Sequence, residues 1–504
     1  MPGVPLALAP SSRSPGVGLL VDLKAGSTSP GTGAKRALLL GCINSSGSTI
    51  TPDTQLVQAV AGESDVGLYA GVGGPTHLAA KRLFEELGSA RVDLACAAAA
   101  ASIAASATMT LAGSVTEART VRSRVSGRIT ETVWASGESV TVAAARHVAA
   151  VNAKTDNMPV TAANVAGVIT FTSKALGRIG NDITLAAQLI GGAGGTVAVS
   201  AAKLAGGTAD PDWTNVLALV AGREYDYIGF VASNFDIAQT TGTAPARAKA
   251  HIDLYKSGLG AKLQQAMHGC TDSTNASLKT GVAAVNHDRS CYWLARDAES
   301  LPCEIMGWAI GQRLREIANN ANTNRIGMTA IAALYGPADL VSGTPTVPEV
   351  EDDLNSGITC VSYDESGLAY VTRPITSYFK LGTGEADDRV LDDTRVDGCD
   401  FVAKDLRTFI ATTFKGLNLI EALADGEELP DNCVSIAEVR ERVIGRMDVH
   451  IRLGIVRRDK FAKAVSDGSF IVRINPTDST QVDYVVPTKI VSHLAKQSLA
   501  VLST

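Results

Sequence analysis

The chain has 504 residues, of which 45% are hydrophobic and 19% are charged, and its formal net charge is −6 at pH 7. A chain of this length is expected to form about two to four domains with a sizeable core. The negative net charge argues against a nucleic-acid-binding face. No stretch reaches the roughly eighteen consecutive apolar residues of a membrane helix. Residues 1–5 lack the charged and apolar regions of a signal peptide, so the protein is expected to be made and kept in a cytoplasm.

The N-terminal third begins with an arm and continues into an α/β unit. Residues 1–36 are rich in Pro, Gly and Ser and contain one extended island, so they are predicted to form an arm rather than a domain. Residues 37–106 are predicted to open the core. Its expected elements are a buried strand at 37–41, a short helical piece at 56–60, a helix at 76–87 after a glycine turn, and a second strand at 92–96.

Residues 107–188 differ in composition and are predicted to form an inserted, separately packed, sandwich-like β domain. They are rich in Thr and Val, and one helix is expected at 139–152. The extended segments are expected at 108–111, 121–125, around Val133, at 168–172 and at 183–185.

Residues 189–399 return to an alternation of strands and helices, which predicts a mostly parallel sheet. Helices are expected at 213–220, 249–267 and 303–321, and strands at 227–231, 283–285, 358–363 and 368–372. The whole chain is therefore predicted to be a multidomain α/β (α+β) protein with a mixed-sheet core, the β-rich insertion and two extended arms.

Residues 400–489 are predicted to form a further domain, followed by a second arm at 490–504. Residues 401–410 place Val402, Leu406, Phe409 and Ile410 on one helical face, and a second helix is expected at 436–444. Extended stretches follow at 469–474 and 482–486. The arm has strand propensity but no later element to pair with, so it is either a frayed end or a strand completed by another chain.

No motif for catalysis or metal binding emerges from the sequence. The glycines at 71–74 fit neither a P-loop nor a dinucleotide fingerprint and are interpreted as a strand-to-helix turn. No GxSxG nucleophile elbow is present, and none of the seven histidines has a partner at metal-ligand spacing. The acidic run at 385–400 lacks the order of a calcium loop and is interpreted as a solvated, salt-bridged loop. No cofactor, no metal and no enzymatic activity are expected.

Several segments in the same order resemble the contractile tail sheath proteins of bacteriophages, closest to the phage Mu type. The likeness is carried by SPGV at 14–17, LYAGVGGPTHLAAKRLFEEL at 68–87, GRIGNDITL at 177–185, LNSGIT at 354–359 with VTRPITSY at 371–378, and the stretch 391–407. Each motif is weak alone, but together they span nearly the whole chain.

The resemblance implies a structural subunit that polymerises as stacked hexameric rings around an inner tail tube and contracts to drive that tube through the host envelope during genome ejection. The expected partners are further copies of the chain, the tail tube protein, and baseplate and tail terminator proteins, without nucleic acid or membrane insertion. The expected location is the virion tail, assembled in the host cytoplasm. In this family the central domain is subtilisin-like in shape, but the chain shows no Asp, His and Ser motifs of a subtilase.

The resemblance also implies site residues. Strand donation to neighbouring subunits is expected from arm residues Val17, Leu19, Leu20, Val21, Leu23, Ile490, Val491, Leu494, Leu499 and Val501. Contact with the inner tube is expected from Lys404, Asp405 and Arg407, unless their helix is an ordinary surface helix of the core domain. Eight cysteines without a CxxC pair are expected to be reduced and mostly buried, although Cys42, Cys270, Cys399 and Cys433 are possible interface thiols.

Two alternatives stay open. The chain fits the sheath of a tailocin or of another contractile injection system as well as that of a phage. From a different class, the alternative is a hydrolase with a subtilisin-like fold, which a nucleophile motif would favour, and no such motif appears.

Overall fold

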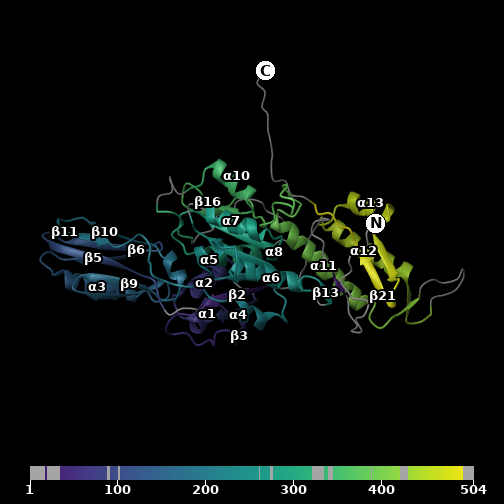
Figure 1. The fold of residues 1–504 in the computed structure, drawn as a ribbon, viewed down its shortest axis with the longest axis horizontal. Helices are drawn as coiled ribbons and strands as arrows, with labels where there is room; N and C mark the ends of the chain where they lie inside the picture. Colours follow the sequence, from purple (N-terminus) through teal and green to yellow (C-terminus); the bar gives the residue numbers. More distant parts are fainter. Residues whose placement is uncertain are drawn as a thin grey trace, which may run out of the picture.

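The computed structural model describes residues 18–19 and 35–491, apart from 88–90, 100–102, 260, 273–275, 320–333, 339–343, 388 and 421–429. The molecule is elongated: the strands of the insertion lie at one end, the large sheet in the middle and the C-terminal helices and hairpin at the other end (Figure 1). Helix α11 runs between the middle and the C-terminal end.

An eight-stranded mixed sheet forms the centre, in the order β17-β16-β15-β14-β12-β2-β4-β3. The six inner strands are parallel, and β3 and β17 are antiparallel at the two edges. In chain order the strands are β2 (Arg36–Cys42), β3 (Leu56–Val60), β4 (Arg91–Ala97), β12 (Tyr227–Phe230), β14 (Gln265–Cys270), β15 (Ser290–Ala295), β16 (Thr359–Tyr363) and β17 (Ala369–Val371). The prediction of an α/β protein with a mixed-sheet core is confirmed.

Helices cover both faces of this sheet. One face carries α2 (Pro75–Leu87) and α8 (Pro302–Asn319), with Trp308 edge-on to Trp293 of β15 at 5.4 Å between ring centroids. Gly307 of α8 lets the two helices approach, because a Cβ there would lie 2.1 Å from the carbonyl oxygen of Ala79. The other helices of the central region are α1 (Glu63–Ala70), α4 (Thr214–Val220), α5 (Asn234–Ala238), α6 (Ala244–Tyr255), α7 (Ala276–Val285) and α10 (Val347–Asn355).

Four expectations for the central region were wrong. Residues 56–60 are strand β3, because the segment adds to the sheet edge through a bulge at Ala59. The helix expected over 249–267 ends at Tyr255, before Gly258, a poor helix former, and β14 follows at Gln265. The strand expected at 283–285 is the end of α7, and β15 starts later. The glycine turn joins two helices, α1 and α2, rather than a strand and a helix.

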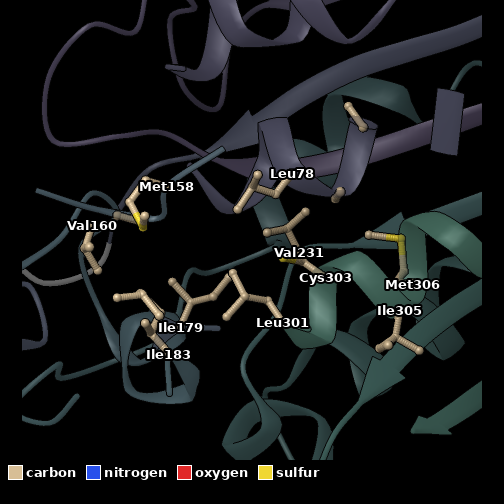
Figure 2. Packing of buried hydrophobic residues seen from close by; sticks show 14 of the residues in the cluster. Leu78, Met158, Val160, Ile179, Ile183, Val231, Leu301, Cys303, Ile305 and Met306 are labelled. Carbon is tan, nitrogen blue, oxygen red and sulfur yellow. The ribbon is translucent and has the colours of Figure 1, made fainter. Parts of the chain in front are cut away.

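The insertion consists of two antiparallel sheets, ordered β10-β6-β7 and β11-β5-β9-β8. Its elements are β5 (Ser106–Val115), β6 (Arg119–Val125), β7 (Arg128–Trp134), α3 (Val140–Asn152), β8 (Val160–Val165), β9 (Val168–Ser173), η2 (Arg178–Asp182), β10 (Leu185–Ile190) and β11 (Gly194–Val199). The sheets therefore extend past residue 188, since β11 pairs with β5. Its core is continuous with the central one: Figure 2 shows Met158 and Ile179 in one cluster with Leu78 and Leu301.

Helix α3 closes the strand edges on one side of the insertion. Arg146 and Lys154 donate hydrogen bonds to backbone carbonyls of the edge strand β7, at Val133 and Ile129. The Asn152 amide makes two 2.8 Å bonds to the backbone of Ala162 in β8, one to its N–H and one to its carbonyl. On the other side, the edge strands β10 and β11 lie next to each other. Side chains and neighbouring strands thus occupy the edges where another strand would otherwise add.

The C-terminal domain packs around α11 (Asp393–Thr413). It contains β18 (Asn418–Ile420), β19 (Cys433–Ser435), α12 (Ile436–Arg452), α13 (Arg458–Ser466), β20 (Ile471–Asn475) and β21 (Asp478–Val485). Val402 and Leu406 of α11 share a core with Val443 and Met447 of α12 and with Phe461 of α13. The two expected helices and the two expected extended stretches are present, and both helices are longer than the sequence predicted.

Candidate functional site

A stripe of charged residues along α11 attaches this helix to the central sheet. Its members recur at alternating intervals of four and three residues and therefore share one helical face. They are Asp393, Asp397, Asp400, Lys404 and Arg407. The first three are acidic and the last two are basic, which also suits the helix dipole. The interpretation of 385–400 as a solvated loop was therefore wrong for its second half, because three of its aspartates are helical and face the core.

The acidic half of the stripe binds buried arginines of the core. Arg289, at the start of β15, donates two 2.6 Å bonds to Asp400. Asp397 accepts bonds from the Tyr227 hydroxyl at 2.6 Å and from the Gln265 amide at 2.9 Å, and it pairs with Arg313 of α8. Paired, hydrogen-bonded charges of this kind are tolerated in a protein interior, but removing one partner is costly.

The basic half of the stripe binds acidic residues that precede β12. The Lys404 ammonium lies 3.0 Å from Asp226 and 3.1 Å from Glu224, and Arg407 lies 3.2 Å from Glu224. Burial alone would lower the pKa of Lys404, but the Asp226 and Glu224 carboxylates outweigh burial and raise that pKa. Lys404 is therefore charged at neutral pH.

Asp405 lies on the other side of α11 and binds α12. It accepts a 2.6 Å bond from Arg446 Nε, and its Oδ2 lies 2.9 Å from His450 Nε2. Burial opposes ionisation, but the bonds from His450 and Arg446 lower the pKa of Asp405 to about 2. Lys404, Asp405 and Arg407 thus all have partners within the subunit, and their contact with an inner tube stays a prediction. The sequence signal that could have identified the contact of α11 with the central sheet is the spacing of the charged stripe, at alternating intervals of four and three residues.

The N-terminal arm enters the fold beside α11. Lys35 lies 3.3 Å from the Asp226 carboxylate, and the Arg36 backbone N–H donates a 2.9 Å bond to it. Lys404 binds the same carboxylate. Further upstream, β1 (Gly18–Leu19) pairs antiparallel with β13 (Gly258–Leu259) of the same chain. Of the predicted donor residues in this arm, Leu19 lies in β1; the others, outside the described residues, are Val17, Leu20, Val21 and Leu23.

The C-terminal arm leaves the fold from a buried anchor. Ile490 is only 4% exposed and packs in a small cluster with Tyr378 and Val390 of the central region and with Val396 and Cys399 of α11. Its backbone pairs with Val456.

Bonds on either side of Ile490 hold the same segment. Arg457 N–H donates to the Lys489 carbonyl at 2.8 Å, and Val491 N–H donates to the Ile455 carbonyl at 3.2 Å. Val491 is 42% exposed. Leu494, Leu499 and Val501 lie outside the described residues, and strand donation by this arm stays a prediction.

The hairpin β20–β21 differs from the sheets of the insertion because both of its outer edges are open among the described residues. The two strands pair with each other from Ile471–Val485 to Asn475–Asp478, and no third described strand joins them. One face is covered by the C-terminal core through Val472 and Tyr484. Unpaired strand edges on a covered sheet are the usual receptors for an added strand.

All eight cysteines belong to the described residues, and none of them forms a disulfide bond. Of the four possible interface thiols, Cys42, Cys270 and Cys399 are buried and Cys433 is half-buried. Burial raises the pKa of Cys42 to about 11 and that of Cys270 to about 12, which disfavours the reactive thiolate. Crosslinking between subunits stays a prediction, and Cys433 is the most accessible candidate for it.

A serine, a histidine and an aspartate meet at the amino end of β15. The His287 Nδ1 lies 3.1 Å from the Ser290 hydroxyl, and its Nε2 lies 3.3 Å from Asp253. In a hydrolytic triad the serine faces Nε2 and the aspartate faces Nδ1, the reverse of this order. Ser290 is also fully buried, so a substrate cannot reach its hydroxyl. The trio instead holds the chain around Ser377, whose N–H and hydroxyl bond to the Ser290 and His287 carbonyls.

The insertion covers the carboxyl ends of β2 and β12, where the strand order reverses. Open α/β sheets commonly bind ligands in this crevice. Here Asn44, just after β2, pairs with Ala175, and the backbone N–H and side-chain amide of Asn234, after β12, donate to Asp182 at 2.9 and 3.1 Å. The glycine turn is part of the same contact, because a Cβ on Gly73 would lie 2.2 Å from the Thr155 carbonyl oxygen.

Asp236 near this contact makes stability depend on pH. Burial raises its pKa from 3.8 to about 7, and the neighbouring Asp210 charge adds to the rise. A raised pKa in the folded state means that the stability contributed by Asp236 is lost as pH rises through about 7. Asp236→Asn is therefore expected to raise the free energy of unfolding by about 1–3 kcal/mol at pH 8, with a smaller gain at pH 5. Urea unfolding at both pH values measures this difference.

Asp212→Asn is the matched control, because Asp212 is an exposed aspartate nearby. It is expected to leave the pH dependence between 5 and 8 unchanged. An Asp236→Asn gain of equal size at both pH values would contradict the assignment.

No helix among the described residues is both long and apolar enough to span a bilayer. Within the same residues, no three His, Cys, Asp or Glu side chains are grouped as a metal site requires.

The chain matches no model of a known protein family and no curated protein. It is structurally similar to two solved sheath tail proteins. The first, from Desulfitobacterium hafniense, is 12% identical with a TM-score of 0.44, and the alignment covers 91% of this chain and 97% of that one. The second, from Listeria innocua, is 13% identical with a TM-score of 0.44, and the alignment covers 93% and 97%.

Proposed function

We propose that this chain is the structural sheath subunit of a contractile bacteriophage tail, closest to the phage Mu type. It polymerises with itself as stacked hexameric rings around the tail tube protein, between baseplate and terminator proteins. Contraction of that lattice drives the tube through the host envelope. The subunit itself carries no catalysis in this proposal.

The observation that carries the proposal is where the open strand edges lie and where the two arms leave the fold, at Lys35–Arg36 and at Lys489–Val491 (the arm roots). The insertion's edges are closed by α3 side chains or by a neighbouring strand, whereas the β20–β21 hairpin is open on both sides among the described residues. The C-terminal arm starts from the same domain, at Ile490 and Val491. A chain with a strand-receiving hairpin and arms at both ends is suited to link with its neighbours by strand addition. The ordered sequence motifs support the same function.

Strand addition also suits a lattice that changes shape. Main-chain hydrogen bonds depend little on side-chain detail, so donated strands can hold neighbours together while whole subunits rotate. The energy of contraction then lies in the difference between two packings of the same subunits, without a nucleotide. The sheath of a tailocin or other injection system meets the same physical requirements.

Negative-stain electron microscopy of the purified full-length chain tests the proposal. Long hollow tubes or cylinders of stacked rings are expected as concentration rises. Uniform small particles at every salt and protein concentration would contradict self-assembly. The hydrolase alternative predicts such particles together with labelling of a serine by a fluorophosphonate probe, which the burial of Ser290 opposes.

A further inference from the structure

The roots of the two arms, Lys35–Arg36 and Lys489–Val491, are both linked to helix α11, the C-terminal root by direct packing and the N-terminal root through the Asp226 carboxylate. At the N-terminal root, the Asp226 carboxylate binds Lys35, the Arg36 backbone N–H and Lys404 of α11. At the C-terminal root, Ile490 packs against Val396 and Cys399 of α11. The two roots lie 455 residues apart in sequence, counted from Lys35 to Ile490, yet both are linked to one helix, directly or through Asp226.

The C-terminal root is held by α11 in a second, indirect way. Ile490 pairs with Val456, and Ile455 and Val456 belong to the core that includes Val402 and Leu406 of α11. A shift of the helix would therefore move both the apolar pocket around Ile490 and the strand segment with which Ile490 pairs.

The ion pairs between the charged stripe of α11 and the central region, called the seam from here on, fix this helix to the core. Asp400 of the seam lies in sequence between Cys399 and Lys404. Asp400 and Arg289 form a buried pair of this seam, with two 2.6 Å bonds, and Asp400 hydrogen-bonds to neither root. The helix is thus also held by a pair whose hydrogen bonds go to neither root.

We infer that α11 couples the two roots mechanically, so that a shift of this helix displaces both roots together. This inference bears on contraction only if the proposed sheath function holds. In a sheath, a subunit would then not shift the root of one arm without shifting the root of the other. Neighbours linked through either arm would then follow the same motion of α11.

Hydrogen exchange on the unassembled full-length chain tests the coupling. Asp400→Ala, which removes a seam contact outside both roots, is expected to speed exchange at the Arg36 amide and at the Arg457 and Val491 amides together, by about tenfold or more. Asp400→Asn keeps one acceptor oxygen and is expected to give a smaller effect at the same amides; it serves if Asp400→Ala does not fold.

Asp353→Ala is the matched control. Asp353 is a fully buried aspartate that accepts three bonds from Arg296, at 3.0, 2.9 and 2.8 Å, and it lies in α10 rather than in α11. At an equal loss of global stability it is expected to leave the three root amides protected. Faster exchange at one root only, or at neither, in the Asp400 variants would overturn the inference. Failure of the wild-type chain to form tubes would instead reject the proposed function and leave the exchange result valid.

Discussion

A chain that ends at Val491 is expected to fold as a stable monomer and to form no tubes. The removed residues, 492–504, contain the predicted donors Leu494, Leu499 and Val501, while the anchor at Ile490 and the bonds around it remain. Loss of the main-chain bonds of a whole strand at every subunit contact should abolish assembly rather than weaken it. Electron microscopy at concentrations where the full-length chain assembles measures this effect, and thermal unfolding shows whether the monomer is intact.

A second truncation, ending at Lys489, separates anchoring from donation. It also removes Ile490, which is buried among four core residues, and burying an isoleucine contributes about 2 kcal/mol or more. We expect this shorter chain to melt at a lower temperature, whereas the chain ending at Val491 should melt like the full-length protein. Normal tubes from either truncated chain would refute strand donation by the C-terminal arm.

Glu304→Ala is expected to cost about 3–5 kcal/mol of stability, because it leaves two buried guanidinium groups without their shared carboxylate. Glu304 is fully buried in α8 and accepts bonds from Arg128 of the insertion at 2.7 Å and from Arg82 of α2 at 3.1 Å. Burial disfavours its charge, but these two arginines outweigh burial and lower the pKa of Glu304. Chemical unfolding measures the loss, which should include loosening of the insertion from the core.

Glu85→Ala provides a control on the same arginine. Glu85 pairs with Arg82 at 2.7 Å but its side chain is one-third exposed, so its removal should cost less than about 1 kcal/mol. Replacing Glu304 with Leu and both Arg82 and Arg128 with Met should restore most of the lost stability, since no buried charge is then unpaired. Equal losses for Glu304→Ala and Glu85→Ala would contradict this account.

The elements with strong periodicity could be predicted from the sequence. The buried strand at 37–41 and the helix at 76–87 carry their hydrophobic pattern locally, and the alternation of strands and helices indicated the parallel sheet. The helix predicted over 249–267 failed because local helix propensity did not reveal that β14 is buried between two parallel strands.

The candidate site was harder to predict because its partners are distant in sequence. The acidic residues at 393–400 have the composition of a solvated loop, and only Arg289 and Arg313, about a hundred residues earlier, make them a buried helical face. Ile490 likewise has the pattern of an arm residue, and only its contacts with Val390 and Val396 identify it as part of a core. The local sequence pattern predicts which residues share one face of a helix, but it does not predict which distant residues pack against that face.

The capped edges of the insertion also have a kinetic consequence. A subunit of the proposed sheath would be made in many copies within one cell, and collisions between exposed strand edges would lead to amorphous aggregates. Asn152 and Lys154 block two of these edges, β8 and β7, with side chains of the same molecule, so the edges are covered without a second subunit. Fewer non-productive contacts between concentrated subunits would then compete with the proposed strand addition at the β20–β21 hairpin.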